Sequence, residues 1–84
     1  MLWTERVNRL LGKEFPDTKP KLMIAGSFVS VRINDPHGTV SVQYFTQVTA
    51  KAAELIKAHG LIFLGRSNTS YHMGGCVTTW EIER

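Results

Sequence analysis

Apolar and polar residues alternate along the middle of the chain, on both sides of a segment with turn chemistry. The segment is Asp35-Pro36-His37-Gly38, in which aspartate can bond its own backbone, proline fixes φ and glycine suits the last position. If Asp35 faces Gly38 across the turn, the residues that then pair across the two strands separate into an apolar face and a polar face. The apolar pairs are Ile33–Val40, Val31–Val42 and Val29–Tyr44. The polar pairs are Asn34–Thr39, Arg32–Ser41 and Ser30–Gln43. A slip of one residue would mix the two sets. The pattern therefore predicts a half-buried antiparallel hairpin over residues 21–46.

The first strand of this hairpin begins near Lys21 and changes phase along its length. The apolar residues lie at even positions for Leu22, Ile24 and Phe28, and then at odd positions for Val29, Val31 and Ile33. A β-bulge or bend at Gly26-Ser27 would reconcile the two phases, and burial of the early part on both faces is the alternative. We favour the bulge.

Two segments have the periodicity of amphipathic helices. In the first, Trp3, Val7, Leu10 and Leu11 share one face, with Thr4 as the expected N-cap and Gly12 as the expected end. The second helix is expected to begin at Thr46 or Thr49 and to end at Gly60, and its apolar face is formed by Val48, Ala52, Leu55, Ile56 and His59.

The C-terminal third of the chain predicts two further strands. Leu61 to Leu64 is a short, wholly apolar run, which is typical of a central strand buried on both faces. Residues 65–75 are polar and glycine-rich and indicate a loop. Cys76 to Ile82 alternates, with Trp80 and Ile82 on its inward side.

Together these elements predict one α+β domain over residues 1–84, a two-layer sandwich in the order α-β-β-α-β-β. Both helices are expected on one face of a four-stranded, mainly antiparallel sheet. The helix between the second and third strands makes those two strands parallel. We expect the strand order 2-1-3-4, with a right-handed crossover.

Composition narrows the class of protein. The chain has 84 residues, a formal net charge of +3, 43% hydrophobic and 20% charged residues, which is typical of a globular domain. Cys76 is the single cysteine, which favours a reducing cytoplasm and excludes an internal disulfide. The N-terminal residues lack the apolar core of a signal peptide, and we expect no membrane partner. No nucleotide-binding fingerprint is present, and we expect no cofactor and no metal.

The polar face of the predicted hairpin and the loop at 65–75 are the candidate sites for a partner. The loop combines hydrogen-bond donors, a cation and glycines, and it is long for a hairpin connection. A plain solvated sheet face and a flexible loop are the alternatives. The candidate partner-binding residues are Arg32, Ser41, Gln43, Arg66, Asn68, Tyr71 and His72.

The mildly basic charge also permits a nucleic-acid-binding hypothesis. Its phosphate contacts would come from Arg6, Arg9, Lys13, Lys51, Lys57 and Arg66. It requires these side chains to form one continuous surface.

Two further patterns carry less weight. His72 and Cys76 could form a nucleophile–base pair, but Cys76 falls in phase with Trp80 and Ile82, so we expect a buried thiol and no enzyme. Asp35-Pro36-His37-Gly38 with Ala50-Lys51-Ala52-Ala53 resembles short parts of double-stranded-RNA-binding domains. In that family a third strand precedes the second helix and that helix begins with paired lysines, so we assign no family on this basis.

The sequence thus favours a small non-enzymatic binding or regulatory protein. We expect it to act on a protein partner or as a homodimer, as an accessory or inhibitory factor of the kind found in phages and mobile elements. Nucleic-acid binding is the alternative.

Overall fold

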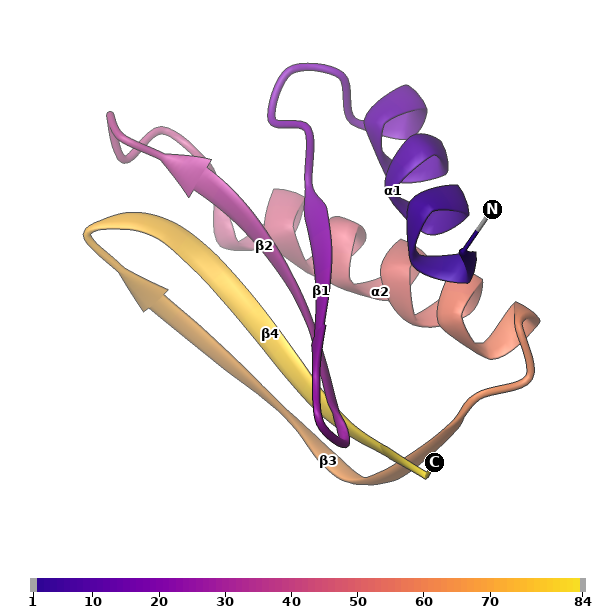
Figure 1. The fold of residues 1–84 in the computed structure, drawn as a ribbon. Coiled ribbons are helices and arrows are strands. Elements are labelled where there is room, and N and C mark those ends of the chain that lie inside the picture. Colours follow the sequence, from indigo (N-terminus) through magenta and orange to yellow (C-terminus); the bar gives the residue numbers. More distant parts are fainter. Residues whose placement is uncertain (1, 84) are drawn as a thin grey trace.

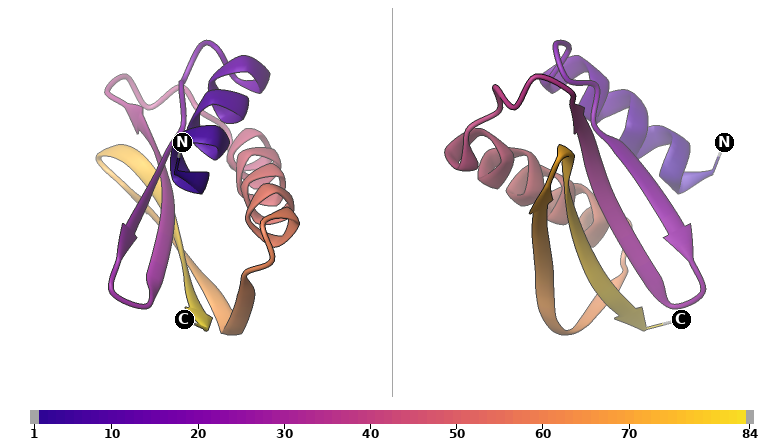
Figure 2. Two further views of the ribbon diagram at one scale, coloured as in Figure 1. Left: turned by 45° about the vertical axis from the view of Figure 1, so that its right-hand side comes forward. Right: turned by 90° about the vertical axis from the view of Figure 1, so that its left-hand side faces the viewer.

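The protein folds as a two-layer α+β sandwich, which confirms the predicted fold class. The computed structural model describes residues 2–83, with the Arg66 side chain outside that description. The elements are α1 (Trp3–Glu14), β1 (Lys21–Ala25), β2 (Phe28–Asp35), α2 (Val42–Ala58), β3 (Ile62–His72) and β4 (Gly74–Glu83). Both helices lie on the same side of the sheet (Figures 1 and 2).

The sheet has the order β1-β2-β4-β3, and every neighbouring pair is antiparallel. The predicted order 2-1-3-4 is therefore wrong, because the last strand inserts between β2 and β3. The parallel direction of the strands before and after the second helix is confirmed, since β2 and β3 are both antiparallel to β4.

The hairpin predicted around Asp35 is wrong, and the true hairpin reverses at Gly26-Ser27. Ala25 pairs with Phe28 across this two-residue turn, and Gly26 has φ +60°, a conformation that costs glycine little. Leu22 lies opposite Val31, so the change of apolar phase marks a chain reversal and not a bulge. Val42 and Tyr44, which we had paired with Val31 and Val29, belong to α2.

Asp35-Pro36-His37-Gly38 does form a turn, but it leads into a helix. The Gly38 N–H donates to the Asp35 carbonyl at 3.1 Å, as in a β-turn. The Asp35 carboxylate accepts hydrogen bonds from the N–H groups of Thr39 and Val40 at 2.9 and 3.1 Å. These bonds direct the chain away from the sheet toward the start of α2.

The second helix begins earlier than Thr46 or Thr49. Its N-cap is Ser41, whose Oγ accepts from the Tyr44 N–H at 3.0 Å. Thr46 lies inside the helix and donates to the Val42 carbonyl at 2.8 Å. The buried face runs from Phe45 to Ile56, so tertiary burial outweighs the β-propensity of residues 42–46.

The core lies between the helices and the sheet. The first helix contributes Val7 and Leu11 to it; its N-cap is Leu2 rather than Thr4, and it continues past Gly12 to Glu14. The strand residues that the helices cover are Leu22, Val29, Val31, Ile33, Cys76, Trp80 and Ile82. Every second residue of β2 and β4 is therefore buried, and the intervening residues face the other way.

One fully buried hydroxyl joins three elements. Thr78 Oγ1 of β4 lies 3.0 Å from Thr49 Oγ1 of α2 and 2.8 Å from Thr69 Oγ1 of β3. Because both of its neighbours are hydroxyls, the buried oxygen of Thr78 has hydrogen-bond partners. Through these two contacts Thr78 also links β3 to α2.

The loop predicted at residues 65–75 is wrong, because these residues extend a long hairpin. β3 reaches His72, which pairs with Gly75 across the turn at Met73-Gly74. Leu64 pairs with Glu81 and Asn68 with Thr79, so β3 carries extra residues between these two positions. β3 is an edge strand, and the prediction of a central strand at Leu61–Leu64 is also wrong.

The position of Gly75 gives a test of this β2–β4 pairing. A Cβ at Gly75 would lie 2.6 Å from the Ile33 carbonyl oxygen, whereas a Cβ at Gly12 would meet nothing within 4 Å. We expect Gly75→Ala to lower the free energy of unfolding by about 1–3 kcal/mol. Gly12→Ala should raise it by up to about 1 kcal/mol, because alanine is the better helix former. Urea unfolding of both variants measures this, and equal effects would contradict the register.

The Asp35 turn gives a test by pH. Desolvation raises the pKa of the Asp35 carboxyl, but the hydrogen bonds from Thr39 and Val40 and the charge of His37 outweigh it, so this pKa lies below its ordinary value of 3.8. The folded state therefore favours the ionised carboxylate. The stabilisation by this carboxylate is complete above the ordinary pKa of 3.8 and disappears as the pH falls through the folded-state pKa. We expect Asp35→Asn to destabilise the protein near neutral pH. The stability difference from the wild type should shrink below about pH 3.8, and a constant difference across this range would contradict the account.

Candidate interaction surface on the open sheet face

One face of the sheet carries no helix, and we call it the open face. It consists of the strand residues that alternate with the buried ones. Across the four strands, in the order β1, β2, β4, β3, the register gives three rows: Ala25, Phe28, Glu81, Leu64; Met23, Ser30, Thr79, Asn68; and Lys21, Arg32, Val77, Ser70. Asn34, Gly75 and His72 form a fourth row. Within residues 2–83, neither helix packs on this face (Figure 2).

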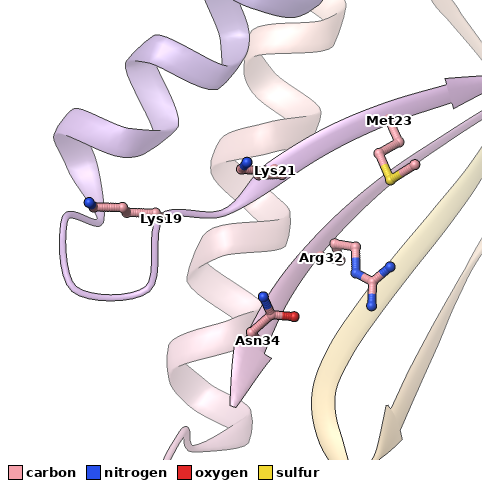
Figure 3. Close-up of a pocket in the computed structure, with 5 residues that line it drawn as sticks. All are labelled: Lys19, Lys21, Met23, Arg32 and Asn34. Carbon is pink, nitrogen blue, oxygen red and sulfur yellow. The ribbon is translucent and has the colours of Figure 1, made fainter. Parts of the chain in front are cut away.

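The end of the open face near the start of β1 is basic and hollowed. A pocket of about 370 Å³ is lined by Lys19, Lys21, Met23, Arg32 and Asn34. Lys21 and Arg32 lie directly opposite each other in the β1–β2 ladder. Figure 3 shows the side chains of Arg32 and Asn34, two residues apart on β2, and that of Lys21 on the adjacent strand β1. We call these five residues the basic pocket.

Lys19, which lines the basic pocket, has a strained backbone conformation. Its φ is +46°, which lies in the left-handed region that residues other than glycine, asparagine and aspartate rarely adopt. Its N–H donates to the Phe15 carbonyl at 2.9 Å, which closes the loop between α1 and β1. The conformation costs about 1–2 kcal/mol. In Figure 3 its side chain extends away from Lys21 and Arg32.

The first helix fixes the strand that carries Lys21 and Met23. The Leu22 N–H donates to Asn8 Oδ1 at 2.6 Å, and Asn8 Nδ2 donates to the Leu22 carbonyl at 3.4 Å. The Asn8 side-chain amide thus makes, at the outer edge of β1, the hydrogen bonds that a neighbouring strand would otherwise make. Because Leu22 is held on the helix side, its neighbours on either side are directed to the open face.

Beyond Met23, which also lines the basic pocket, the open face becomes apolar, and its other end carries an acidic residue. Met23, Phe28 and Leu64 are 55%, 49% and 41% exposed. Glu81 lies between Phe28 and Leu64 in the register. The open face is therefore basic at one end and acidic at the other, with apolar side chains between and around the charges.

The residues predicted to bind a partner divide among three places. Arg32, Asn68 and His72 occupy positions on the open face. Tyr71 occupies the opposite face, where its ring packs edge-on against the Phe45 ring with 5.9 Å between the ring centroids. Ser41 is the N-cap of α2 and Gln43 lies in its first turn, while the Arg66 side chain lies outside the described residues.

Most of the residues of the nucleic-acid hypothesis lie on the helices. Arg6, Arg9 and Lys13 are exposed on α1. On α2, Lys51 pairs with Glu54 at 3.8 Å, and the Lys57 ammonium lies 5.5 Å from the centre of the Phe63 ring. The basic residues that line one pocket, Lys19, Lys21 and Arg32, are a different set. Sequence reasoning missed Lys19 and Lys21, although a hairpin centred on Gly26-Ser27 would have placed Lys21 opposite Arg32.

The thiol of Cys76 belongs to the core. Burial, and then the charge of Asp35, raise the pKa of the Cys76 thiol, which favours the protonated thiol over the reactive thiolate. Cys76 faces the helices, whereas His72 pairs with Gly75 on the alternate phase, so the two side chains do not face each other. No group of three metal-ligating side chains occurs among residues 2–83, and no helix in that range is long and apolar enough to span a bilayer.

Comparison with known protein families finds no matching family model, and comparison with curated proteins finds no significant match.

The Asn8–Leu22 contact gives a test of how β1 is held. Asn8→Ala removes both hydrogen bonds and leaves the Leu22 N–H and C=O without their partners, so we expect a loss of about 1–3 kcal/mol in unfolding free energy. Amide exchange at Leu22 should become faster. Asn68→Ala, on exposed β3, is the control and should change stability by less than about 0.5 kcal/mol. Unchanged protection of the Leu22 amide in Asn8→Ala would show that the side chain does not hold the strand.

Proposed function

We propose that this protein is a small non-enzymatic binding protein that engages another protein through its open face. The observation that carries the proposal is the group of exposed apolar side chains, Met23, Phe28 and Leu64, on a sheet face that neither helix covers. Apolar side chains grouped on one face of a small domain commonly mark an interaction site.

The arrangement of charge also supports a protein partner. Protein interfaces combine an apolar centre with a polar, charged rim, and the open face has this composition. A standard interface covers about 800 Å² of each partner, and the total accessible surface here is 5616 Å². An interface of that size would use roughly one seventh of the surface, which a four-stranded sheet face can supply.

A nucleic-acid partner is less well supported. The acidic Glu81 shares the open face with Arg32, so a phosphate backbone that follows the sheet would meet repulsion. Platforms for single strands stack bases on several aromatic rings, and Phe28 is the aromatic ring that the described strands present on this face. Lys51 and Lys57 are partly engaged with Glu54 and Phe63.

We also propose a cellular location for the protein and the kind of factor that it is. A single buried thiol suits a reducing cytoplasm. A domain of this size with a binding face and no described catalytic group suits an accessory or inhibitory factor of a larger protein, of the phage or mobile-element kind.

A pair of variants tests the proposal. Phe28→Ser with Leu64→Ser removes two apolar side chains from the open face, and we expect it to reduce capture of the partner from nuclease-treated host lysate by about tenfold or more. Leu10→Ser is the matched control, because Leu10 is 42% exposed but lies on α1. Capture is quantified by mass spectrometry of the retained proteins.

Two results would contradict the proposal. One is full capture by the open-face variant, provided that its unfolding midpoint matches that of the wild type. The other is a purified protein whose mass in solution is that of a dimer and falls to a monomer in the open-face variant, since the face would then bind a second copy.

A further inference from the structure

We infer that the basic pocket binds the carboxylates of an acidic segment of the protein partner. The inference rests on the proposed function and specifies the chemistry of one end of the open face. Its residues are Lys19, Lys21, Arg32 and Asn34, with Met23 as an apolar wall.

Among the described residues, the cationic side chains of the pocket form no ion pair. Three of its five lining residues are cationic and none is acidic. The ion pair found within residues 2–83, between Lys51 and Glu54, lies on α2. Glu81 shares the open face but lies in the row of Phe28, two rows from Arg32.

The pairing of Lys21 with Arg32 makes an anion favourable. Like charges directly opposite each other in an antiparallel ladder destabilise it. The ladder is nevertheless formed, because Val31 and Leu22 are buried on the other face and Asn8 holds the edge. A bound carboxylate would neutralise this repulsion, so binding and strand pairing would reinforce each other.

The donor groups suit carboxylates. The Arg32 guanidinium offers a planar pair of donors that matches a carboxylate, the lysines supply flexible charges, and Asn34 supplies a neutral amide donor. Met23 gives the methylene groups of a glutamate side chain an apolar contact. Met23 lines the pocket and is a diagonal neighbour of Phe28 in the β1–β2 ladder, so an acidic residue bound there can belong to a segment that continues across Phe28.

A titration with a synthetic hexaglutamate peptide tests the inference. We expect saturable chemical-shift changes at the backbone amides of residues 19–34, weakening as salt is raised. Lys21→Gln with Arg32→Gln should weaken the binding by about tenfold or more. Arg9→Gln with Lys13→Gln removes the same charge from the outer face of α1 and should leave binding within about twofold of the wild type. Unfolding midpoints of both variants confirm that the fold is retained.

Defined results overturn the inference. These are the absence of saturable shifts on β1 and β2, equal binding by the two double variants, or tighter binding of a dodecathymidylate oligonucleotide than of hexaglutamate at the same amides. The last result would assign the pocket to nucleic acid.

Failure here is distinguishable from failure of the proposed function. If hexaglutamate does not bind while the Phe28 and Leu64 variant still loses the partner, the anion site alone is wrong. If capture is indifferent to Phe28 and Leu64, the open face is not the binding surface.

Discussion

Burial of both helices against the same face of one sheet is the constraint that determines the rest of this molecule. The apolar stripes of α1 and α2 converge on the inward residues of β2 and β4, from Val29 to Ile33 and from Cys76 to Ile82. Within residues 2–83, the structure places no further helix or strand over the other side of the sheet. The open face therefore follows directly from the way the core is built, and the proposed binding function uses this uncovered surface.

The fold class could be predicted from the sequence, whereas the strand register could not. Helical spacing in residues 3–11 and 48–59 and alternation in β2 and β4 were strong local signals. The alternation of Val40, Val42 and Tyr44 was misleading, because Phe45, Val48, Ala52 and Ile56 also fit a helical stripe and are buried as one. The deciding contacts join residues distant in sequence, such as Thr78 with Thr49, which local patterns do not reveal.

The candidate site was predictable to a similar extent. Arg32 was identified because it lies on the polar phase of β2, and that alternation is local. Lys21 was missed because its position depends on where the chain reverses. With Gly26-Ser27 interpreted as a bulge, Arg32 was paired with Ser41, whereas the two-residue turn places Lys21 opposite Arg32. Polar composition also concealed β3, since an edge strand exposed on both faces needs few apolar residues.

The central claim, that the open face binds another protein, is tested most directly by site-specific photo-crosslinking in the producing cells. A benzophenone side chain replaces Phe28 in one version of the protein and Leu10 in another, since both positions are exposed but lie on opposite layers. The account predicts a covalent adduct with another protein from position 28 and little or none from position 10. Adducts from position 10 alone, or equal adducts from both, would contradict it.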